Sequence, residues 1–473
     1  MREYSELYID GTWQAPAVAA PLTDVHGAAD GTVVTRVPAG SALDVDRAVD
    51  AARRAFETWS QTTGAERGAF LGKLAEGLTA RADELALLIA DEVGMPMKLA
   101  RKVQVAGPLM IMQSYAKLAA EYEFTREVGN SLVVREPAGV IGAILPWNYP
   151  LFLLVSKVAP ALAAGCTVVL KPADVAPGVC FVFAELCEQV GLPPGVFNLV
   201  SGGDEAGEAV SKHPGIDVVS FTGSTAVGAL VAAAASANIA RVALELGGKS
   251  ANIILDDADL EKAVAAGVNN AFLNSGQTCA AWTRMLVPAA LQDEACALAE
   301  KAVARLTVGH PKDETSRLGP LASAEQRDRV ASFIEIGISE GARLVVGGPG
   351  LPDGVDENGY YVKPTVFADV TPSMRIAREE IFGPVLSIMP YTDEDDAVRI
   401  ANDTEYGLHG AVFSANGDRA LRVARRLRTG QVDINGGAWN PLAPFGGYKK
   451  SGLGRELGEF GIEEFLEIKS IQR

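Results

Sequence analysis

The sequence predicts an α/β protein with two open α/β regions. Short β-rich runs alternate with longer helical patterns along most of the chain, which favours helices layered over mostly parallel sheets. The length of 473 residues exceeds the size at which one hydrophobic core stops growing, so at least two domains are expected.

The first region contains five expected strands. They lie at 140 to 145, 167 to 170, 196 to 200, 218 to 221 and 242 to 246, and helical patterns occupy roughly 151 to 164, 177 to 190, 204 to 211 and 224 to 237. The largely helical segment from 44 to 124 is expected to pack against this sheet.

The second region repeats the alternation with different spacing. Its expected strands are 251 to 255, 285 to 287, 385 to 389 and 432 to 435, separated by helices near 258 to 273, 289 to 305, 323 to 340, 393 to 402 and 417 to 428.

Composition excludes several classes of function. A formal charge of −17 and a pI near 4.8 argue against nucleic acid as a partner. Five cysteines without a CxxC pair fit reduced thiols, so a cytoplasmic location is expected. The N-terminus has no apolar signal-like stretch, and the longest apolar run, 150 to 170, is interrupted by Lys157 and Pro160, so no membrane association is expected.

Cys279 ends the polar loop NSGQTC, whereas the other four cysteines lie in apolar strand or helix patterns. A buried cysteine is usually a small hydrophobic residue, but a loop cysteine beside free backbone N–H groups can have a lowered pKa and act as a nucleophile. We therefore predict that Cys279 is the reactive thiol.

Glu245 interrupts the apolar strand pattern VALEL just before Gly247 and Gly248. Burying a carboxylate in a central strand costs free energy unless it is paired or near water, and desolvation would raise its pKa into the range of a general base. The alternative is a solvent-facing position on an edge strand.

Asn148 follows Pro146 and Trp147 at the point where a strand turns into a helix. It is either a helix N-cap or, with the backbone N–H of Cys279, an amide donor to an oxyanion.

Two turns indicate a nucleotide site. FTGSTAVG opens a helix and places Gly223 and Ser224 where a pyrophosphate can sit, although it is not a GxGxxG motif and a plain N-cap turn explains it as well. Lys171 and Asp174 follow a strand, at the usual place for ribose hydroxyls in open sheets, and an ordinary helix-entry turn is the alternative.

The four histidines show no metal spacing and no link to a Ser or Cys motif. A zinc site or a Ser-His-Asp hydrolase is therefore poorly supported, and no metal is expected.

Taken together, these motifs resemble the aldehyde dehydrogenase superfamily, from YIDGTW at 8 to 13 through PFGGYKKSGLGRELGEFG at 444 to 461. The resemblance implies Cys279 as nucleophile, Glu245 as the base for deacylation, Asn148 as oxyanion donor and Lys157 as a proton-relay partner. It further implies a cofactor-binding set of Trp147, Lys171, Asp174, Gly223, Ser224, Glu380 and Phe382.

The resemblance also implies a domain plan. A Rossmann-like cofactor domain would span 1–117 and 138–247, a catalytic domain 248–450, and a small β oligomerisation arm and tail 118–137 and 451–473. Pairing of the arm with a neighbouring subunit would give a homodimer or homotetramer, and would cover an exposed strand edge.

Two departures from the family pattern bear on specificity. Asp174 stands where relatives usually carry Glu, and a carboxylate there disfavours the 2′-phosphate of NADP, so NAD is the expected cofactor and NADP the alternative. Ser156 stands where many relatives carry an aromatic residue. A roomy apolar tunnel for a medium or bulky aldehyde is expected, lined by Tyr149, Leu154, Ser156, Trp439 and Phe445.

Three alternatives remain at this stage. A semialdehyde dehydrogenase for a small charged substrate would need an arginine in the tunnel, and Arg284 is the nearest candidate in the sequence. A CoA-acylating enzyme would not need Glu245 to activate water. A non-catalytic structural relative would not need Cys279, Glu245 and Asn148 together.

Overall fold

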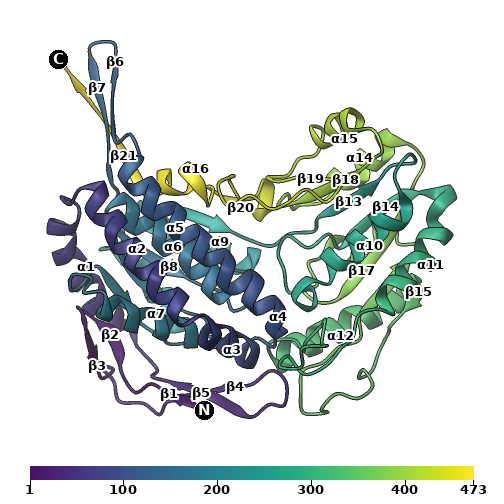
Figure 1. Cartoon of the computed structure of the whole chain (residues 1–473), viewed down its shortest axis with the longest axis horizontal. Coiled ribbons are helices and arrows are strands. Elements are labelled where there is room, and N and C mark those ends of the chain that lie inside the picture. The colour runs from purple at the N-terminus through teal and green to yellow at the C-terminus, as the bar shows by residue number, and fades with distance from the viewer.

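The computed structural model describes residues 1–473 and consists of two α/β units and a projecting three-stranded arm. The two units lie side by side, and the arm extends from the unit that contains the N-terminus (Figure 1). The predicted fold class is confirmed by this arrangement and by the solved structures compared below.

The first unit is built on an eight-stranded sheet in the order β20-β12-β11-β8-β9-β10-β2-β3. Its five central strands are parallel and correspond to the five expected ones: β12 (Arg241–Glu245), β11 (Val218–Thr222), β8 (Val140–Ile144), β9 (Thr167–Lys171) and β10 (Phe197–Leu199). They read as near-continuous apolar runs because both faces of the sheet are covered.

Helices cover both faces of this sheet. One face carries α6 (Pro150–Ala164) and α7 (Gly178–Gln189), backed by α2 (Gly64–Ala80), α3 (Ala82–Glu92) and α5 (Ala106–Glu121), in a core of 58 buried residues. The other face carries α1 (Ala42–Trp59), α8 (Asp204–Lys212) and α9 (Thr225–Ser236). The segment 44 to 124 is thus helical and packs on the sheet as expected, with the short α4 (Met97–Leu99) and a π-helix (Ala100–Val105) joining α3 to α5.

The second unit has a seven-stranded sheet in the order β15-β16-β17-β14-β13-β18-β19. The strands are β15 (Arg343–Val346), β16 (Thr365–Ala368), β17 (Val385–Tyr391), β14 (Arg284–Pro288), β13 (Ala251–Ile254), β18 (Gly410–Phe413) and β19 (Asp433–Ile434), and only β15 is antiparallel. The sequence reading missed β15, β16 and β18.

Helices again cover both faces of the second sheet. One face carries α10 (Leu260–Ala271) and α11 (Gln292–Val303). The other carries α12 (Ala324–Ser339), α13 (Arg375–Arg378), α14 (Glu394–Asn402) and α15 (Gly417–Ala424).

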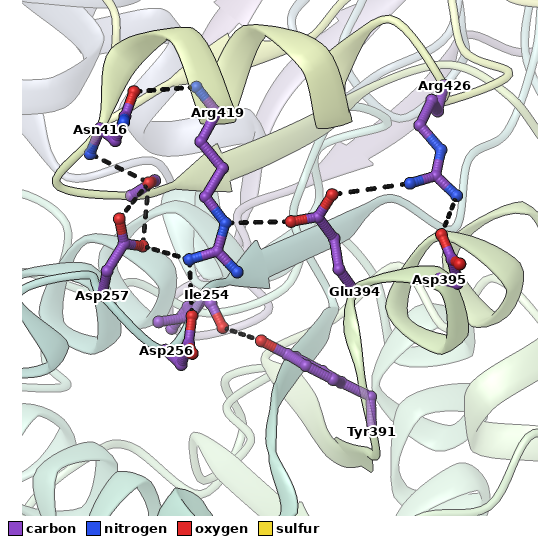
Figure 2. Close-up of polar contacts among 10 residues, drawn as sticks. Ile254, Asp256, Asp257, Tyr391, Glu394, Asp395, Asn416, Arg419 and Arg426 are labelled. Atoms are coloured by element: carbon purple, nitrogen blue, oxygen red, sulfur yellow. Dashed lines mark hydrogen bonds and ion pairs between the residues drawn. The ribbon is translucent and has the colours of Figure 1, made fainter.

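An ion-pair network closes the carboxyl edge of the second sheet (Figure 2). The Arg419 guanidinium lies 2.6 Å from Asp256 Oδ1 and 3.2 Å from Asp257 Oδ1, and its Nε lies 3.0 Å from Glu394 Oε2. Nη2 of Arg426 continues the network to Asp395 at 2.5 Å. One arginine therefore joins the turns that follow β13 and β17 to helix α15.

The N-terminal strands were not expected from the sequence. The hairpin β2 (Leu7–Ile9) and β3 (Thr12–Gln14) extends the first sheet antiparallel to β10. The strands β1 (Arg2–Glu3), β4 (Thr23–His26) and β5 (Val33–Val37) form a separate small sheet.

The arm pairs β6 (Thr125–Val128) and β7 (Ser131–Pro137) with β21 (Leu466–Gln472). The rest of the predicted tail lies elsewhere, because β20 (Gly452–Leu453) pairs with β12, and α16 (Gly458–Glu463) packs against α6. The segment 118 to 121 still belongs to α5. The predicted domain division remains a prediction. The strands of the arm itself lie within the narrower ranges 125–137 and 466–472.

No helix combines the length and the apolar character needed to cross a membrane.

Candidate active site

The expected functional residues of the first unit follow the carboxyl ends of its parallel strands. Asn148 follows β8, Lys171 ends β9, Gly223 follows β11 and Glu245 ends β12. The sheet order places β8 between β9 and β11, where the chain reverses its direction of strand addition. Open α/β sheets bind ligands at such a point.

Asn148 lies just before α6 and is 4 % exposed. Its side-chain Nδ2 donates to the backbone oxygen of Gln277 at 3.0 Å, so the amide faces the loop that carries Cys279. Its own carbonyl accepts from Gln104 Nε2 at 3.2 Å and from Asn274 Nδ2 at 3.1 Å. Asn148 is therefore a fixed donor at the catalytic loop rather than an N-cap.

The loop before Cys279 contains two consecutive left-handed residues. Asn274 has φ 52° and Ser275 φ 55°, a conformation that costs about 1–3 kcal/mol for each non-glycine residue. Hydrogen bonds hold it in place: Ser275 Oγ donates to the Gly319 carbonyl at 2.8 Å, and Gln277 Oε1 accepts from the Ala322 backbone N–H at 2.9 Å. The loop is thus fixed before any ligand arrives.

Cys279 is the one cysteine that is not fully buried. The expectation of a lowered thiol pKa was wrong: burial raises the pKa of Cys279, and the negative charges of Glu380 and Glu245 raise it further. A backbone hydrogen bond at Ala280 lowers the pKa, but its effect is smaller than that of desolvation. The thiol therefore needs a nearby base.

Glu245 is 5 % exposed, and its Oε2 has no hydrogen-bond partner. Burial raises the pKa of this carboxyl well above its usual value, and the neighbouring Glu456 raises it further, while Lys157 opposes the shift. The edge-strand alternative is excluded, because β12 lies between β11 and β20. Glu245 is a buried carboxyl with a free oxygen, as a general base requires.

Lys157 lies on α6 and is 1 % exposed. Its ammonium group lies 2.7 Å from Glu456 Oε1 and 3.1 Å from Ser220 Oγ. Glu456 was missed by the sequence reading, because nothing local to residue 456 shows that the tail returns to this site. Lys157, Glu456 and Glu245 form a buried group of charges that can accept and pass a proton.

Gly247 and Gly248 lie in a space that admits no side chain. A Cβ at Gly247 would lie 2.3 Å from Glu380 Oε2, and one at Gly248 would lie 2.5 Å from the Cys279 carbonyl oxygen. The Gly248 N–H donates to Glu380 Oε1 at 2.9 Å. The two glycines thus let the Glu380 carboxylate and the Cys279 backbone approach the same turn.

Glu380 and Phe382 lie in the loop before β17. Burial raises the pKa of Glu380 to about 7. Phe382 has φ 62° and its carbonyl accepts from Gln326 Nε2 at 2.7 Å, which holds the strained residue. Its ring packs edge-on against Trp147 at 5.5 Å between centroids, so the second unit meets the end of β8 here.

The remaining expected cofactor residues lie at the carboxyl edge of the first sheet. Lys171 Nζ lies 3.6 Å from Asp174 Oδ1, with the lysine largely buried and the carboxylate partly exposed. Ser224 caps α9 by accepting from the Val227 N–H at 3.3 Å, and Gly223 donates its N–H to the Glu245 carbonyl. The role of Ser224 as a helix cap is compatible with pyrophosphate binding at the same turn, because the capped N-terminus of α9 still has free N–H groups.

The expected tunnel residues fall into two groups. Tyr149 lies just before α6, and its hydroxyl hydrogen-bonds to Thr278 Oγ1 at 2.7 Å. Phe152 and Ser156, four residues apart, share one face of α6. Leu154 lies on another face and is 0 % exposed in the core, so its position does not support a tunnel role. Phe152, not expected from the sequence, packs against Trp439 with the rings tilted and their centroids 5.8 Å apart.

Phe445 and Ser156, two further expected tunnel residues, both lie in or against the part of the first unit built around α6. Phe445 packs on the core that contains α6, and its backbone bonds that of Glu456 in both directions. The hydroxyl of Ser156 is buried without a partner.

Arg284 is not a tunnel residue. It is 2 % exposed and donates to the backbone oxygens of Lys249, Ile400 and Ala401 at 2.8 to 2.9 Å. The charged-substrate alternative therefore loses its candidate arginine.

Comparison with known proteins identifies the family. Residues 13–471 match the sequence model described as the Aldehyde dehydrogenase family. The chain belongs to this family. Among curated aldehyde dehydrogenases, the 3-succinoylsemialdehyde-pyridine dehydrogenase of a Pseudomonas species is 50% identical over 473 residues, covering 100% of this chain and 99% of the relative.

Two solved aldehyde dehydrogenases have the same fold. The enzyme of Pseudomonas syringae, a cysteine-to-alanine variant in complex with NAD+ and octanal, is 49% identical with a TM-score of 0.97, covering 99% of this chain and 96% of that one. The enzyme of Mycobacterium tuberculosis in complex with NAD+ is 45% identical with a TM-score of 0.97, covering 100% and 98%. The family prediction is confirmed.

Proposed function

We propose that this aldehyde dehydrogenase oxidises an aldehyde to a carboxylic acid with NAD through a covalent adduct on Cys279. The observation that carries the proposal is the meeting of three groups from separate segments: the Cys279 loop, the Asn148 amide bonded to that loop, and the free Glu245 carboxyl oxygen.

The first step is addition of the Cys279 sulfur to the aldehyde carbon. Because burial raises the thiol pKa, a base must take the proton, and Glu380 and Glu245 are the carboxylates whose charges act most strongly on Cys279. Asn148 can donate to the resulting oxyanion if its amide exchanges the Gln277 carbonyl for the substrate oxygen. NAD accepts the hydride.

The thioester that remains on Cys279 is then hydrolysed. Glu245 deprotonates a water, and the Lys157–Glu456 pair beside it offers a route by which the proton leaves the buried site. Because an activated water serves hydrolysis and not transfer to CoA, this arrangement favours the carboxylic acid as product.

The residues at the carboxyl edge fit NAD. Lys171 and Asp174 would hold the adenosine ribose, the N-terminus of α9 behind Gly223 and Ser224 would face the pyrophosphate, and Glu380 would hold the second ribose. The Asp174 carboxylate would repel a 2′-phosphate, which favours NAD over NADP, and NAD+ is bound in both solved relatives described above.

The substrate proposed is a medium or bulky apolar aldehyde. Tyr149, just before α6, and Phe152, on α6 beside Trp439, would supply an aromatic wall, and the small Ser156 one turn further along would not narrow it. The octanal complex and the name of the pyridine semialdehyde relative support such substrates. A semialdehyde joined to an aromatic ring is the second candidate, favoured by that relative.

Cys279→Ala tests the mechanism, with Cys296→Ala as the control. The first variant should lose NADH formation with octanal while keeping NAD binding by calorimetry, and the control should keep both. Undiminished turnover in Cys279→Ala would exclude the proposal. Product analysis with and without CoA, and kcat/KM for octanal, a pyridine-bearing semialdehyde and succinic semialdehyde, separate the substrate alternatives.

We expect a homodimer or homotetramer held through the arm. β21 exposes Ile468 and Ile471, and an apolar strand that projects from the body favours pairing. Sedimentation of the chain with and without residues 466–472 tests this.

A further inference from the structure

Two buried cations at the amino edge of the second sheet have no carboxylate partner. Lys249 and Arg284 are each 2 % exposed, and no carboxylate oxygen lies within 4.0 Å of either. Nζ of Lys249 makes no hydrogen bond at all. Isolated buried charges are costly, and most are paired.

The two cations also act on each other. Burial lowers the pKa of Lys249 to about 7, and the charge of Arg284 lowers it further. Burial lowers the pKa of Arg284 to about 10, and the more distant Asp403 opposes that shift only in part. The carboxylates that act on Lys249, Glu380 and Glu379, are likewise beyond ion-pair distance, and Glu380 is engaged with the Gly248 N–H.

Both residues line one small cavity. It offers about 20 Å³ to the centre of a water-sized sphere, where one water needs about 10–15 Å³. Among its lining residues are four basic side chains, Lys249, Arg284, His409 and Arg428, and no acidic one. Asp433, 3.3 Å from His409 Nε2, is the nearest carboxylate to that histidine and lies outside the lining.

The donors that remain suit an anion. Arg284 uses three of its five N–H groups on backbone oxygens, and Lys249 uses none of its ammonium hydrogens. Thr404 and Tyr406 add hydroxyl-bearing side chains to the lining, whereas the Thr429 hydroxyl already donates to the Gln431 carbonyl at 2.8 Å. A water could accept a hydrogen bond here but would leave the charge of Arg284, and that of Lys249 whenever it is protonated, uncompensated.

We propose that this cavity binds one small monovalent anion of halide size, held by Lys249 with Arg284 beside it. The anion supplies the missing countercharge. Lys249 directly follows Gly247 and Gly248, the turn that contacts Glu380 and the Cys279 backbone. A bound anion would therefore stabilise the amino edge of the second sheet, where the Cys279 loop lies.

Bromide is the probe. Crystals of the unmodified protein grown in sodium bromide should give an anomalous peak in the cavity, in contact with Lys249 Nζ. Water alone in the cavity, or bromide bound only elsewhere, overturns the proposal.

Thermal unfolding gives an independent measurement. Between zero and saturating bromide, the melting temperature of the unmodified protein should rise by about 2 °C relative to that of Lys249→Met, because a ligand that binds only the folded state stabilises it. Lys450→Met, which removes an exposed lysine, should respond like the unmodified protein and so cancels general salt effects. Equal responses in all three proteins contradict the proposal, and if Lys249→Met does not fold, the crystallographic result decides alone.

Discussion

The two α/β units use opposite edges of their parallel sheets. In the first unit, the residues expected to bind cofactor and activate water follow the carboxyl ends of β8, β9, β11 and β12. In the second, Cys279, Glu380 and Lys249 all lie before β14, β17 and β13, at the amino edge. The carboxyl edge of the second sheet is closed instead by Arg419 and its carboxylate partners (Figure 2).

This difference shows how one topology serves two purposes. A carboxyl edge with free helix N-termini is a ligand site, and the same edge filled by ion pairs is a structural joint. The prediction that follows is a separation of effects: changes at the first edge should alter rates, and changes at the second should alter stability.

The largest effect is expected for Glu245→Gln. Loss of a general base typically lowers a rate by about 10²–10⁴-fold, and the thioester should accumulate because its hydrolysis needs Glu245, whereas Glu380 can still take the thiol proton in the first step. Stopped-flow absorbance should show one burst of NADH per active site followed by slow turnover. Glu459→Gln, an exposed carboxyl on the same tail segment as Glu456, is the control, and full steady-state activity in Glu245→Gln would remove it from this role.

Glu92 is a buried carboxyl of the first unit that lies away from the carboxyl edge of the sheet, so replacing it should change stability and not rate. Glu92 accepts from Thr35 Oγ1 at 2.6 Å and from the Gly178 N–H at 3.1 Å, and burial raises its pKa to about 7. The pKa of Glu92 in the folded state lies above its unfolded value near 4.5. Its contribution to the free energy of unfolding is therefore fully present below pH 4.5 and is lost as pH rises through 7, a total change of about 3 kcal/mol.

Glu92→Gln should therefore remove this pH dependence. Urea unfolding at pH 5 and pH 8 should show the unmodified protein losing about 2.5 kcal/mol more than the variant between the two values, because a small part of the effect is already lost at pH 5. The exposed Glu76→Gln should behave like the unmodified protein. A parallel loss in Glu92→Gln would show that Glu92 is not the titrating group.

The smallest effect is expected at the closed edge. Arg419→Met leaves Asp256, Asp257 and Glu394 without their shared cation, and should lower the free energy of unfolding by about 1–2 kcal/mol at low salt, and by less in 1 M salt. Arg422→Met, on the same helix without an ion pair, should change little. Since no proposed catalytic residue lies at this edge, kcat/KM of Arg419→Met should stay within about twofold of the unmodified value. A loss of rate without a loss of stability would contradict the proposed difference between the two carboxyl edges.

The sequence predicted most of the first unit, and it singled out the residues that we propose to be reactive. Apolar runs identified its five parallel strands, and an acid in VALEL and a thiol in NSGQTC stood out because they contradict their local pattern. What it could not predict depends on contacts between distant segments. β2 and β3 join the sheet by pairing with β10, and Glu456 reaches Lys157 from the tail.

Two misses have more local causes. Leu154 was expected to line the tunnel but packs in the core, whereas Phe152, two residues earlier, contacts Trp439 and was not expected. The thiol pKa depends on how deeply the folded protein buries Cys279 among carboxylates, which loop composition does not reveal.

The pairing of β20 with β12 has a consequence for biosynthesis. Gly452 lies beside Glu245 in the sheet, and Glu456 lies beside Lys157, so a segment synthesised well after Glu245 completes the surroundings of the base. A nascent chain that already contains Cys279, Asn148 and Glu245 still lacks these neighbours. The base should therefore reach its working environment only after residues 452 to 456 have been synthesised and have folded against it.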